Sequence, residues 1–388
     1  MSLWGPLAER YETVRPRTLL ALDGGGIRGI ITLEILIEIE RVLAEATGEG
    51  KNFRLCNFFD YIAGTSTGAI IAAGLTRGMS VKEILDFYIR IGPAMFDRAF
   101  LIQRMKYRFR AEPLERELKR VFGARSNLFP QYLRNLLLVV TRNVTTDSPW
   151  PISSNPLAKY NDPARADCNL AIPLWQLVRA STAAPIYFPP ETLQWDPNDP
   201  EKTFVFVDGG VTPYNNPAFL LFRMATQAPY KLQWKTGERE LLLISVGTGS
   251  APQIDLEIGS SGRNHLSTLI GLPSALMYGA SIDQDINARV FGRCVFGAPI
   301  DRELGDLIPR DAAGLPTPLA EDVGRAFLYA RYNADLSQDG LRAMGLPDID
   351  PKHVGQLDAT DYIPALRRIG KKAAEQVQRE HFGSFVSG

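Results

Sequence analysis

The chain has 388 residues, and its 43 Lys and Arg balance its 43 Asp and Glu, so the formal net charge at pH 7 is zero. Hydrophobic residues make up 45% and charged residues 22%, a composition that excludes an intrinsically disordered chain. A zero net charge also argues against a protein that binds a nucleic acid polymer through overall positive charge, and no such partner is expected.

Histidine and cysteine are both scarce, with three of each. The cysteines form no CxxC pair, so the sequence predicts neither a disulfide framework nor a zinc ribbon and favours a reducing compartment. We expect no metal and no cofactor. The N-terminus lacks the apolar core of a secretory signal, and no run approaches the roughly 18 apolar residues that cross a bilayer. The expected location is cytoplasmic.

Strand and helix patterns alternate along the first 250 residues. Residues 17–22 form an apolar run before a glycine cluster, and residues 30–44 repeat apolar side chains at helical spacing. Residues 58–63 form a second run, followed by GTSTG and a short apolar helix. Further strands are predicted at residues 136–141, 204–207 and 241–246. This alternation predicts an α/β fold with helices on both faces of a mostly parallel sheet.

Two segments rich in Pro, Asn and Asp, residues 148–163 and 194–200, are predicted to be surface loops. From residue 251 onward the strand signal fades, and residues 360–380 are predicted to form a closing helix. We therefore expect a core over residues 17–250 and a C-terminal helical extension over residues 251–388, packed on that core.

The first glycine cluster has the sequence DGGGIRG and follows a strand. Gly24, Gly26 and Gly29 match G-x-G-x-x-G, which would place a dinucleotide phosphate at the start of the next helix. Alternatively, the amides of the loop form an oxyanion hole, aided by the charge of Arg28. A tight turn without any ligand is a third interpretation, and this motif alone does not decide between them.

The second glycine motif is more specific. Ser66 is the centre of G-x-S-x-G, between a predicted strand and a predicted helix, which is the setting of a nucleophile elbow. Gly64 and Gly68 relieve crowding in a sharp turn and leave the hydroxyl accessible. The helix that starts at Thr67 directs its positive end toward the serine. A dinucleotide-binding enzyme gives no reason for such a serine.

A serine nucleophile needs a base. Asp208 follows the run FVFV and precedes two glycines, so at the end of a parallel strand it would share a sheet edge with both glycine loops. Its plainer interpretation is a turn aspartate that caps the next element. A triad of Ser66, Asp208 and one of His265, His353 or His381 stays open, although none of these histidines directly follows a strand. A buried carboxylate can itself be the base.

DGGGIRG, GTSTG and DGG, in this order and at these separations, resemble the motifs of the patatin-like phospholipase family. Residues 181–190, 215–218 and 245–249 are also similar to stretches of that family, and the resemblance covers roughly residues 17–250. It implies a three-layer α/β/α fold and a lipid acyl hydrolase with Ser66 as nucleophile and Asp208 as base, without histidine or metal. The oxyanion hole that it implies is framed by Gly24, Gly25, Gly26 and Arg28.

Residues 89–110 combine aromatic side chains with arginines and lysines, among them Arg104, Lys106 and Arg108. This segment could dock on anionic headgroups at the inner membrane surface or act as a lid, and a partly buried helix explains it equally well. The C-terminal part is similar to that of long bacterial patatins, some of them antiphage effectors activated by a cyclic nucleotide. A cyclic dinucleotide activator is thus one hypothesis for this part, and a packing extension is the other. The sequence is compatible with a homo-oligomer.

The sequence leaves open two hypotheses from other functional classes. One is a catalytically idle, patatin-shaped binding or storage protein, which the intact serine and aspartate disfavour. The other is an oxidoreductase that binds a dinucleotide on the first glycine loop. That enzyme needs an acidic residue after a second strand about 20 residues on, where this sequence predicts helix.

Overall fold

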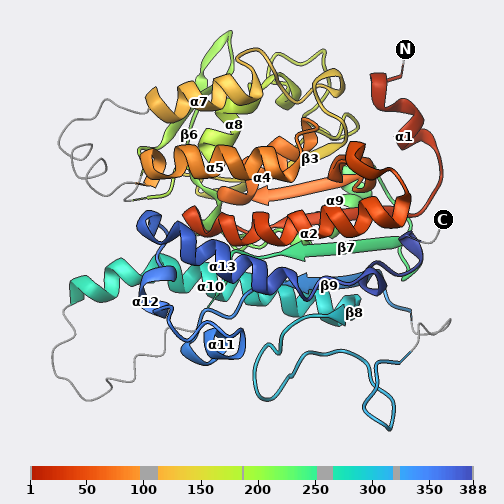
Figure 1. Ribbon diagram of the computed structural model, residues 1–388. Coiled ribbons are helices and arrows are strands. Elements are labelled where there is room, and N and C mark those ends of the chain that lie inside the picture. The colour runs from red at the N-terminus through yellow and green to blue at the C-terminus, as the bar shows by residue number, and fades with distance from the viewer. Residues whose placement is uncertain (1, 97–111, 186–187, 251–264, 318–323, 387–388) are drawn as a thin grey trace.

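The computed structural model describes residues 2–96, 112–185, 188–250, 265–317 and 324–386 of the chain. A nine-stranded sheet lies at its centre, in the order β5-β6-β3-β2-β1-β7-β9-β8 with β4 also paired to β3 (Figure 1). The strands are β1 (Arg17–Leu22), β2 (Tyr61–Thr65), β3 (Leu136–Asn143), β4 (Ser148–Ser153), β5 (Glu191–Asp196), β6 (Asp199–Asp208), β7 (Leu241–Val246), β8 (Arg293–Phe296) and β9 (Leu328–Tyr332). The helices are α1 (Ala8–Glu12), α2 (Gly29–Thr47), α3 (Leu55–Phe58), α4 (Thr67–Thr76), α5 (Val81–Phe96), α7 (Glu112–Phe122), α8 (Leu174–Ser181), α9 (Ala218–Thr226), α10 (His265–Phe291), α11 (Gln338–Ala343), α12 (Pro351–Val354) and α13 (Ile363–Ala374).

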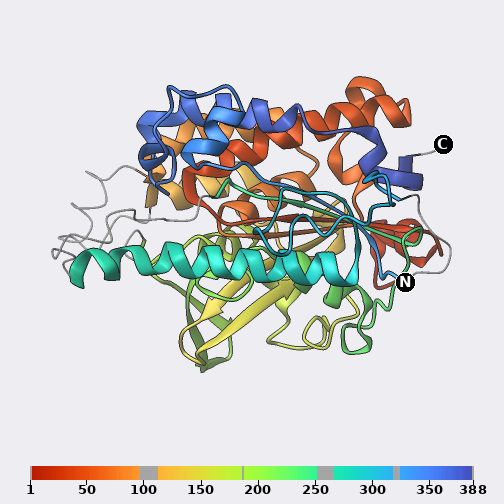
Figure 2. The ribbon, with the colours of Figure 1, turned by 90° about the horizontal axis from the view of Figure 1, so that it is seen from below.

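Alternate residues of the central strands face opposite sides of the sheet. In β1, Leu20 and Leu22 join a hydrophobic cluster that also contains apolar residues of α2, α4, α5 and α13. Leu19 and Ala21 join a second cluster, which contains the apolar face of α9. Figure 2 shows α2 and α13 on one side of the sheet and α10 on the other. The predicted three-layer α/β/α fold with a mostly parallel sheet is confirmed.

The C-terminal part contributes to this sheet, which the sequence analysis does not predict. The sequence indicates no strand after residue 250, whereas β8 and β9 extend the sheet beyond β7 in parallel pairing. Every residue of β9 is buried, so its sequence lacks the alternation of polar and apolar residues that identifies a half-exposed strand. Helices α10 to α13 thus accompany two strands, and the sheet continues across the expected boundary at residue 250.

The two segments expected to be surface loops also contain strands. β4 forms a hairpin with β3, and residues 194–200 contain the turn between β5 and β6. Pro149 and Pro151 obscure β4 in the sequence, because proline cannot donate to a strand partner. Among the described strands β4 pairs with β3 alone, and such an edge position tolerates proline.

The direction of β6 differs from the prediction. Asp208 was expected at the end of a parallel strand, but β6 is antiparallel to β3, with Asp208 opposite Thr141. The amides of Leu136 and Val144 donate to Asp60 O of the chain before β2 and to Val205 O of β6, at 3.1 and 2.9 Å. Because amides an even number of residues apart face the same side of a strand, β2 and β6 lie end to end along one side of β3. Their C-terminal ends therefore meet.

The basic residues Arg104, Lys106 and Arg108 of the segment proposed for membrane docking lie outside the described residues. Within the described ranges, no helix combines the length and the hydropathy that crossing a bilayer requires.

Candidate active site

Ser66 lies in the sharp turn between β2 and α4. Its φ of 54° and ψ of −121° are strained for a residue with a side chain. A Cβ atom on Gly64 would lie 2.1 Å from Gly68 O, and one on Gly68 would lie 2.2 Å from Leu22 O. Both glycines are therefore required by close backbone approach, and the turn has the geometry expected of a nucleophile elbow.

Asp208 contacts this serine directly. Ser66 Oγ donates to Asp208 Oδ2 at 2.5 Å, and Gly210 N donates to Asp208 Oδ1 at 2.7 Å. The C-terminal ends of β2 and β6 meet, which produces this contact. β2 ends at Thr65, one residue before Ser66, and β6 ends at Asp208 itself. A Ser–His–Asp triad needs an imidazole between the two side chains, and the direct contact leaves no room for one.

The buried environment of Asp208 makes its carboxylate more basic than that of an exposed aspartate. Burial raises the pKa of Asp208 from 3.8 to about 6, and the hydrogen bonds from Ser66 and Gly210 and the charge of Arg179 oppose this rise. Near neutral pH such a carboxylate is ionised, and its basicity is higher than that of an exposed aspartate. The site thus pairs a serine hydroxyl with a carboxylate that can accept its proton.

Ser181, at the end of α8, holds the backbone of the elbow. Its buried Oγ accepts from Ser66 N at 2.9 Å and donates to Val140 O of β3 at 2.7 Å. The sequence places Ser181 in a stretch typical of the patatin-like family, but gives it no role, because its partners are 115 and 41 residues away.

Ser181→Ala is expected to lower kcat about tenfold and to lower the free energy of unfolding by about 1–3 kcal/mol, because Ser66 N and Val140 O lose a buried partner. Steady-state kinetics and urea unfolding measure the two effects. Ser384→Ala, at an exposed position, is the matched control and should change neither quantity. An unchanged kcat in Ser181→Ala would show that Ser181 does not position the serine.

The glycine loop reaches the same sheet edge from β1. Gly24 N donates to Asn215 O at 3.1 Å, whereas among the described residues the amides of Gly25 and Gly26 donate to no protein acceptor. A Cβ on Gly25 would lie 2.1 Å from Thr248 Oγ1, and Gly26 has a φ of 61°, so both positions need glycine. Arg28 N and Nε each donate to Gly25 O at 3.3 Å, which holds the loop.

A buried ion pair supports the loop from behind. Arg331 of β9 donates to Asp23 Oδ1 at 2.8 Å and Oδ2 at 2.5 Å, and to Ser245 Oγ at 2.7 Å. Both side chains of the pair are only 5% exposed. Burial raises the pKa of Asp23, and Arg331 opposes that rise. The sequence does not indicate this contact, because it does not predict β9.

The start of α2 is not free to bind a phosphate. Ile27 N, near this helix end, already donates to Leu357 O at 2.9 Å, and a Cβ on Gly26 would lie 2.2 Å from the same oxygen. The backbone at Leu357 thus occupies the space where a dinucleotide phosphate would bind. This packing contradicts the interpretation of the first glycine loop as a dinucleotide site.

A small cavity of about 50 Å³ adjoins the serine. Mostly apolar side chains line it, among them Ile70, Phe188, Val211, Met277 and Leu357. Sites that bind small molecules usually measure roughly 300–1,000 Å³, so an acyl chain enters only if lining side chains move.

The histidines serve other purposes where their side chains are described. His381 is buried and its Nδ1 lies 2.8 Å from Tyr332 Oη, and burial lowers the pKa of His381 to about 4. His353 stacks on Tyr362 at 4.5 Å between ring centroids. His265 begins α10, and its side chain is outside the description. All three cysteines are free and buried.

Comparison with known proteins gives a consistent result. A family model described as patatin-like phospholipase matches residues 20–222. Patatin-like protein 4 of Arabidopsis thaliana is 32% identical over 60% of this chain and 60% of its own length. A cGAMP-activated phospholipase of Vibrio cholerae is 30% identical over 63% and 67%, and Patatin-15 of Solanum tuberosum is 30% identical over 61% and 62%.

The chain therefore spans about three fifths to two thirds of the length of these relatives. Among solved structures, VipD of Legionella pneumophila aligns with a TM-score of 0.36 and 14% identity over 91% of this chain and 67% of that one. A likeness of that size is too weak to carry a conclusion.

Proposed function

Because this chain belongs to the patatin-like phospholipase family, we propose that it is a serine lipid acyl hydrolase of the phospholipase A type, with Ser66 as nucleophile and Asp208 as base. The contact of 2.5 Å between Ser66 Oγ and Asp208 Oδ2 at a strained elbow is the observation that carries this proposal. Strain at a serine costs stability and persists where function requires it.

In the first half of the proposed reaction, Asp208 accepts the proton of Ser66 while Oγ attacks the ester carbonyl of a glycerolipid. The tetrahedral intermediate collapses, the alcohol leaves with the proton from Asp208, and an acyl-enzyme remains. In the second half, Asp208 takes a proton from water, which attacks the acyl-enzyme. The fatty acid leaves, and the proton returns to Ser66.

The amides of Gly25 and Gly26 are the proposed oxyanion donors, because they lack a protein acceptor among the described residues. Gly24 has a different role: its amide is bonded to Asn215 O, and its missing side chain lets Asn215 Oδ1 approach to 2.4 Å from the Cβ position. Arg28 holds the loop and supplies positive charge next to it. Donors fixed before the reaction stabilise the oxyanion without the cost of reorganisation.

The apolar lining around Ser66 suits an acyl chain, and we propose a peripheral location at the inner membrane surface, where such chains are available. The test combines product analysis with covalent labelling. Incubation with phospholipid vesicles should release fatty acid and lysophospholipid with the native protein and neither with Ser66→Ala. A fluorophosphonate probe should label the native serine only. Labelling without lipid turnover would favour the idle binding or storage protein.

The pH dependence of the reaction follows from Asp208. A base must be deprotonated, and burial raises the pKa of Asp208 to about 6, so kcat/KM is expected to fall tenfold per pH unit below about 6. A pH–rate profile from pH 4.5 to 8.5 on a soluble ester measures this limb. A flat profile between pH 4.5 and 6 would contradict a role for Asp208 as the base.

Control by a cyclic nucleotide is a separate part of the proposal. The support is the resemblance to a cGAMP-activated phospholipase, which covers 63% of this chain. Under this proposal, a cyclic dinucleotide raises the rate of lipid hydrolysis at least tenfold. The protein would then act in an antiviral response that produces such a nucleotide. Equal rates with and without cyclic dinucleotides would contradict this part and leave the catalytic assignment intact.

A further inference from the structure

A second and larger cavity lies near the N-terminal ends of the central strands, whereas Ser66 lies at their C-terminal ends. It measures about 710 Å³ and lies between the chain around α1 and the loop at residues 130–134. The central strands begin here: Thr18 N donates to Asp60 Oδ2 at 3.1 Å, and Leu136 N donates to Tyr11 Oη at 2.8 Å. The charged residues of its lining are Glu9, Arg10, Arg15, Arg77 and Arg134. Four guanidinium groups thus face one carboxylate of the lining.

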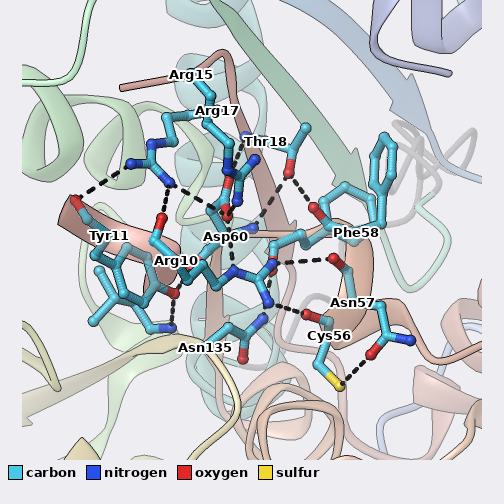
Figure 3. Close-up of polar contacts among 12 residues, drawn as sticks. Arg10, Tyr11, Arg15, Arg17, Thr18, Cys56, Asn57, Phe58, Asp60 and Asn135 are labelled. Carbon is cyan, nitrogen blue, oxygen red and sulfur yellow. Dashed lines mark hydrogen bonds and ion pairs between the residues drawn. The ribbon is translucent and has the colours of Figure 1, made fainter. Parts of the chain in front are cut away.

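The buried carboxylate of Asp60 does not neutralise this charge. Arg10, Arg15 and Arg17 all form ion pairs with Asp60, which is fully buried (Figure 3). Arg10 also donates to Cys56 O at 2.6 Å and Phe59 O at 2.8 Å. These contacts give Arg10 and Arg17 a structural role. Three guanidinium charges against one carboxylate still leave an excess of two positive charges beside the cavity.

Arg77 and Arg134 add charge that no carboxylate in the described part of the chain pairs with. Among the described residues neither forms an ion pair with a carboxylate, and Arg77 Nη1 donates to Tyr132 O. Burial lowers the pKa of Arg77, and the charge of Arg134 lowers it further, so the two groups are close enough to repel. Like charges side by side at a cavity are stabilised when an anion lies between them.

We propose that this cavity binds a soluble small molecule that carries two or more phosphate groups. Guanidinium groups form paired hydrogen bonds with phosphate oxygens, and about 710 Å³ is within the range of small-molecule sites and far larger than one phosphate needs. A lipid headgroup fits the same chemistry. However, a membrane that supplies lipid to Ser66 contacts the C-terminal ends of the strands, away from this cavity. This argument against a headgroup rests on the proposed function.

Isothermal titration calorimetry of the full chain in the Ser66→Ala background tests this site without any turnover, so its result is independent of hydrolysis. Sodium pyrophosphate is expected to bind at least tenfold more tightly than inorganic phosphate. Arg134→Gln, at an exposed position, and Arg77→Gln should each weaken pyrophosphate binding tenfold or more. Arg342→Gln, which removes an exposed arginine of α11 paired with Asp339, is the matched control and should leave binding unchanged.

Two results would overturn the proposal. One is the absence of saturable pyrophosphate binding, or binding that both arginine variants leave unchanged. The other comes from flotation with phosphatidylcholine vesicles that contain 20% phosphatidylglycerol, used here as a probe of lipid headgroups. If Arg77→Gln and Arg134→Gln abolish flotation while pyrophosphate fails to bind, the cavity recognises a membrane surface rather than a soluble ligand.

Discussion

Asp208→Asn is expected to lower kcat by about three orders of magnitude or more, with KM much less affected. Asparagine has nearly the same shape, so Gly210 N keeps an acceptor and Ser66 keeps a neighbour. What disappears is the group that accepts the serine proton in both halves of the reaction. Kinetics on a soluble ester and on phospholipid vesicles measure the loss, with Ser66→Ala as the reference for a site without a nucleophile.

The same substitution should not weaken the fold. Burial raises the pKa of Asp208 from 3.8 to about 6, so the folded state binds this proton more tightly than the unfolded state does. The stability linked to that proton is complete below about pH 4 and is lost as the pH rises through 6. Near pH 7.5 the ionised carboxylate costs up to roughly 3 kcal/mol, a cost that asparagine removes.

Urea unfolding at pH 7.5 is therefore expected to show Asp208→Asn at least as stable as the native chain. Asp147→Asn, at a side chain that is 81% exposed, is the matched control and should retain activity. A variant that is both inactive and several kcal/mol less stable would indicate that Asp208 holds the fold, and the catalytic assignment would lose its support.

Local sequence predicts the sharp turn at Ser66 correctly, because each requirement of that turn is local. The strand, the glycines and the helix that shape the turn at Ser66 lie within a few residues of one another, and Gly64 and Gly68 meet backbone atoms that leave no space for a Cβ. The sequence also predicts Asp208 at the same sheet edge. The predicted position of Asp208 is correct, but the predicted strand direction is wrong. β6 is antiparallel to β3 and ends where β2 ends.

Contacts between distant parts of the chain could not be predicted in this way. Ser181 supports an amide 115 residues earlier, and the family-like stretch around it gives no sign of that contact. The arginines around Asp60 similarly look like surface charges in the sequence. Arg17 becomes buried and Arg10 half-buried only because the N-terminal segment packs against the start of the sheet.

Arg331 is the most consequential of the residues that the sequence analysis missed. It belongs to the C-terminal part, yet it neutralises Asp23 at the base of the glycine loop, 308 residues earlier. Residues 251–388 thus supply two strands of the sheet, β8 and β9, and the positive charge that pairs with Asp23 below the glycine loop. A fragment that ends at residue 250 would leave Asp23 buried without its partner, so we expect it not to fold into an active core.

Arg331→Met tests this dependence in the full chain. The variant leaves a buried carboxylate unpaired, and the free energy of unfolding is expected to fall by about 3–5 kcal/mol. Without Arg331 the pKa of Asp23 rises further, so the loss should be larger at pH 8 than at pH 5, where protonation relieves the buried charge. Urea unfolding at both pH values measures the difference.

The controls separate this charge from packing. Arg342→Met removes an arginine that is 64% exposed and should change the free energy of unfolding by less than about 0.5 kcal/mol. Asp23→Asn combined with Arg331→Met removes both charges and should recover part of the loss, because the penalty comes from the unpaired carboxylate. A loss below about 1 kcal/mol in Arg331→Met would mean that the glycine loop keeps its position without β9, and the C-terminal part would then be a packing extension after all.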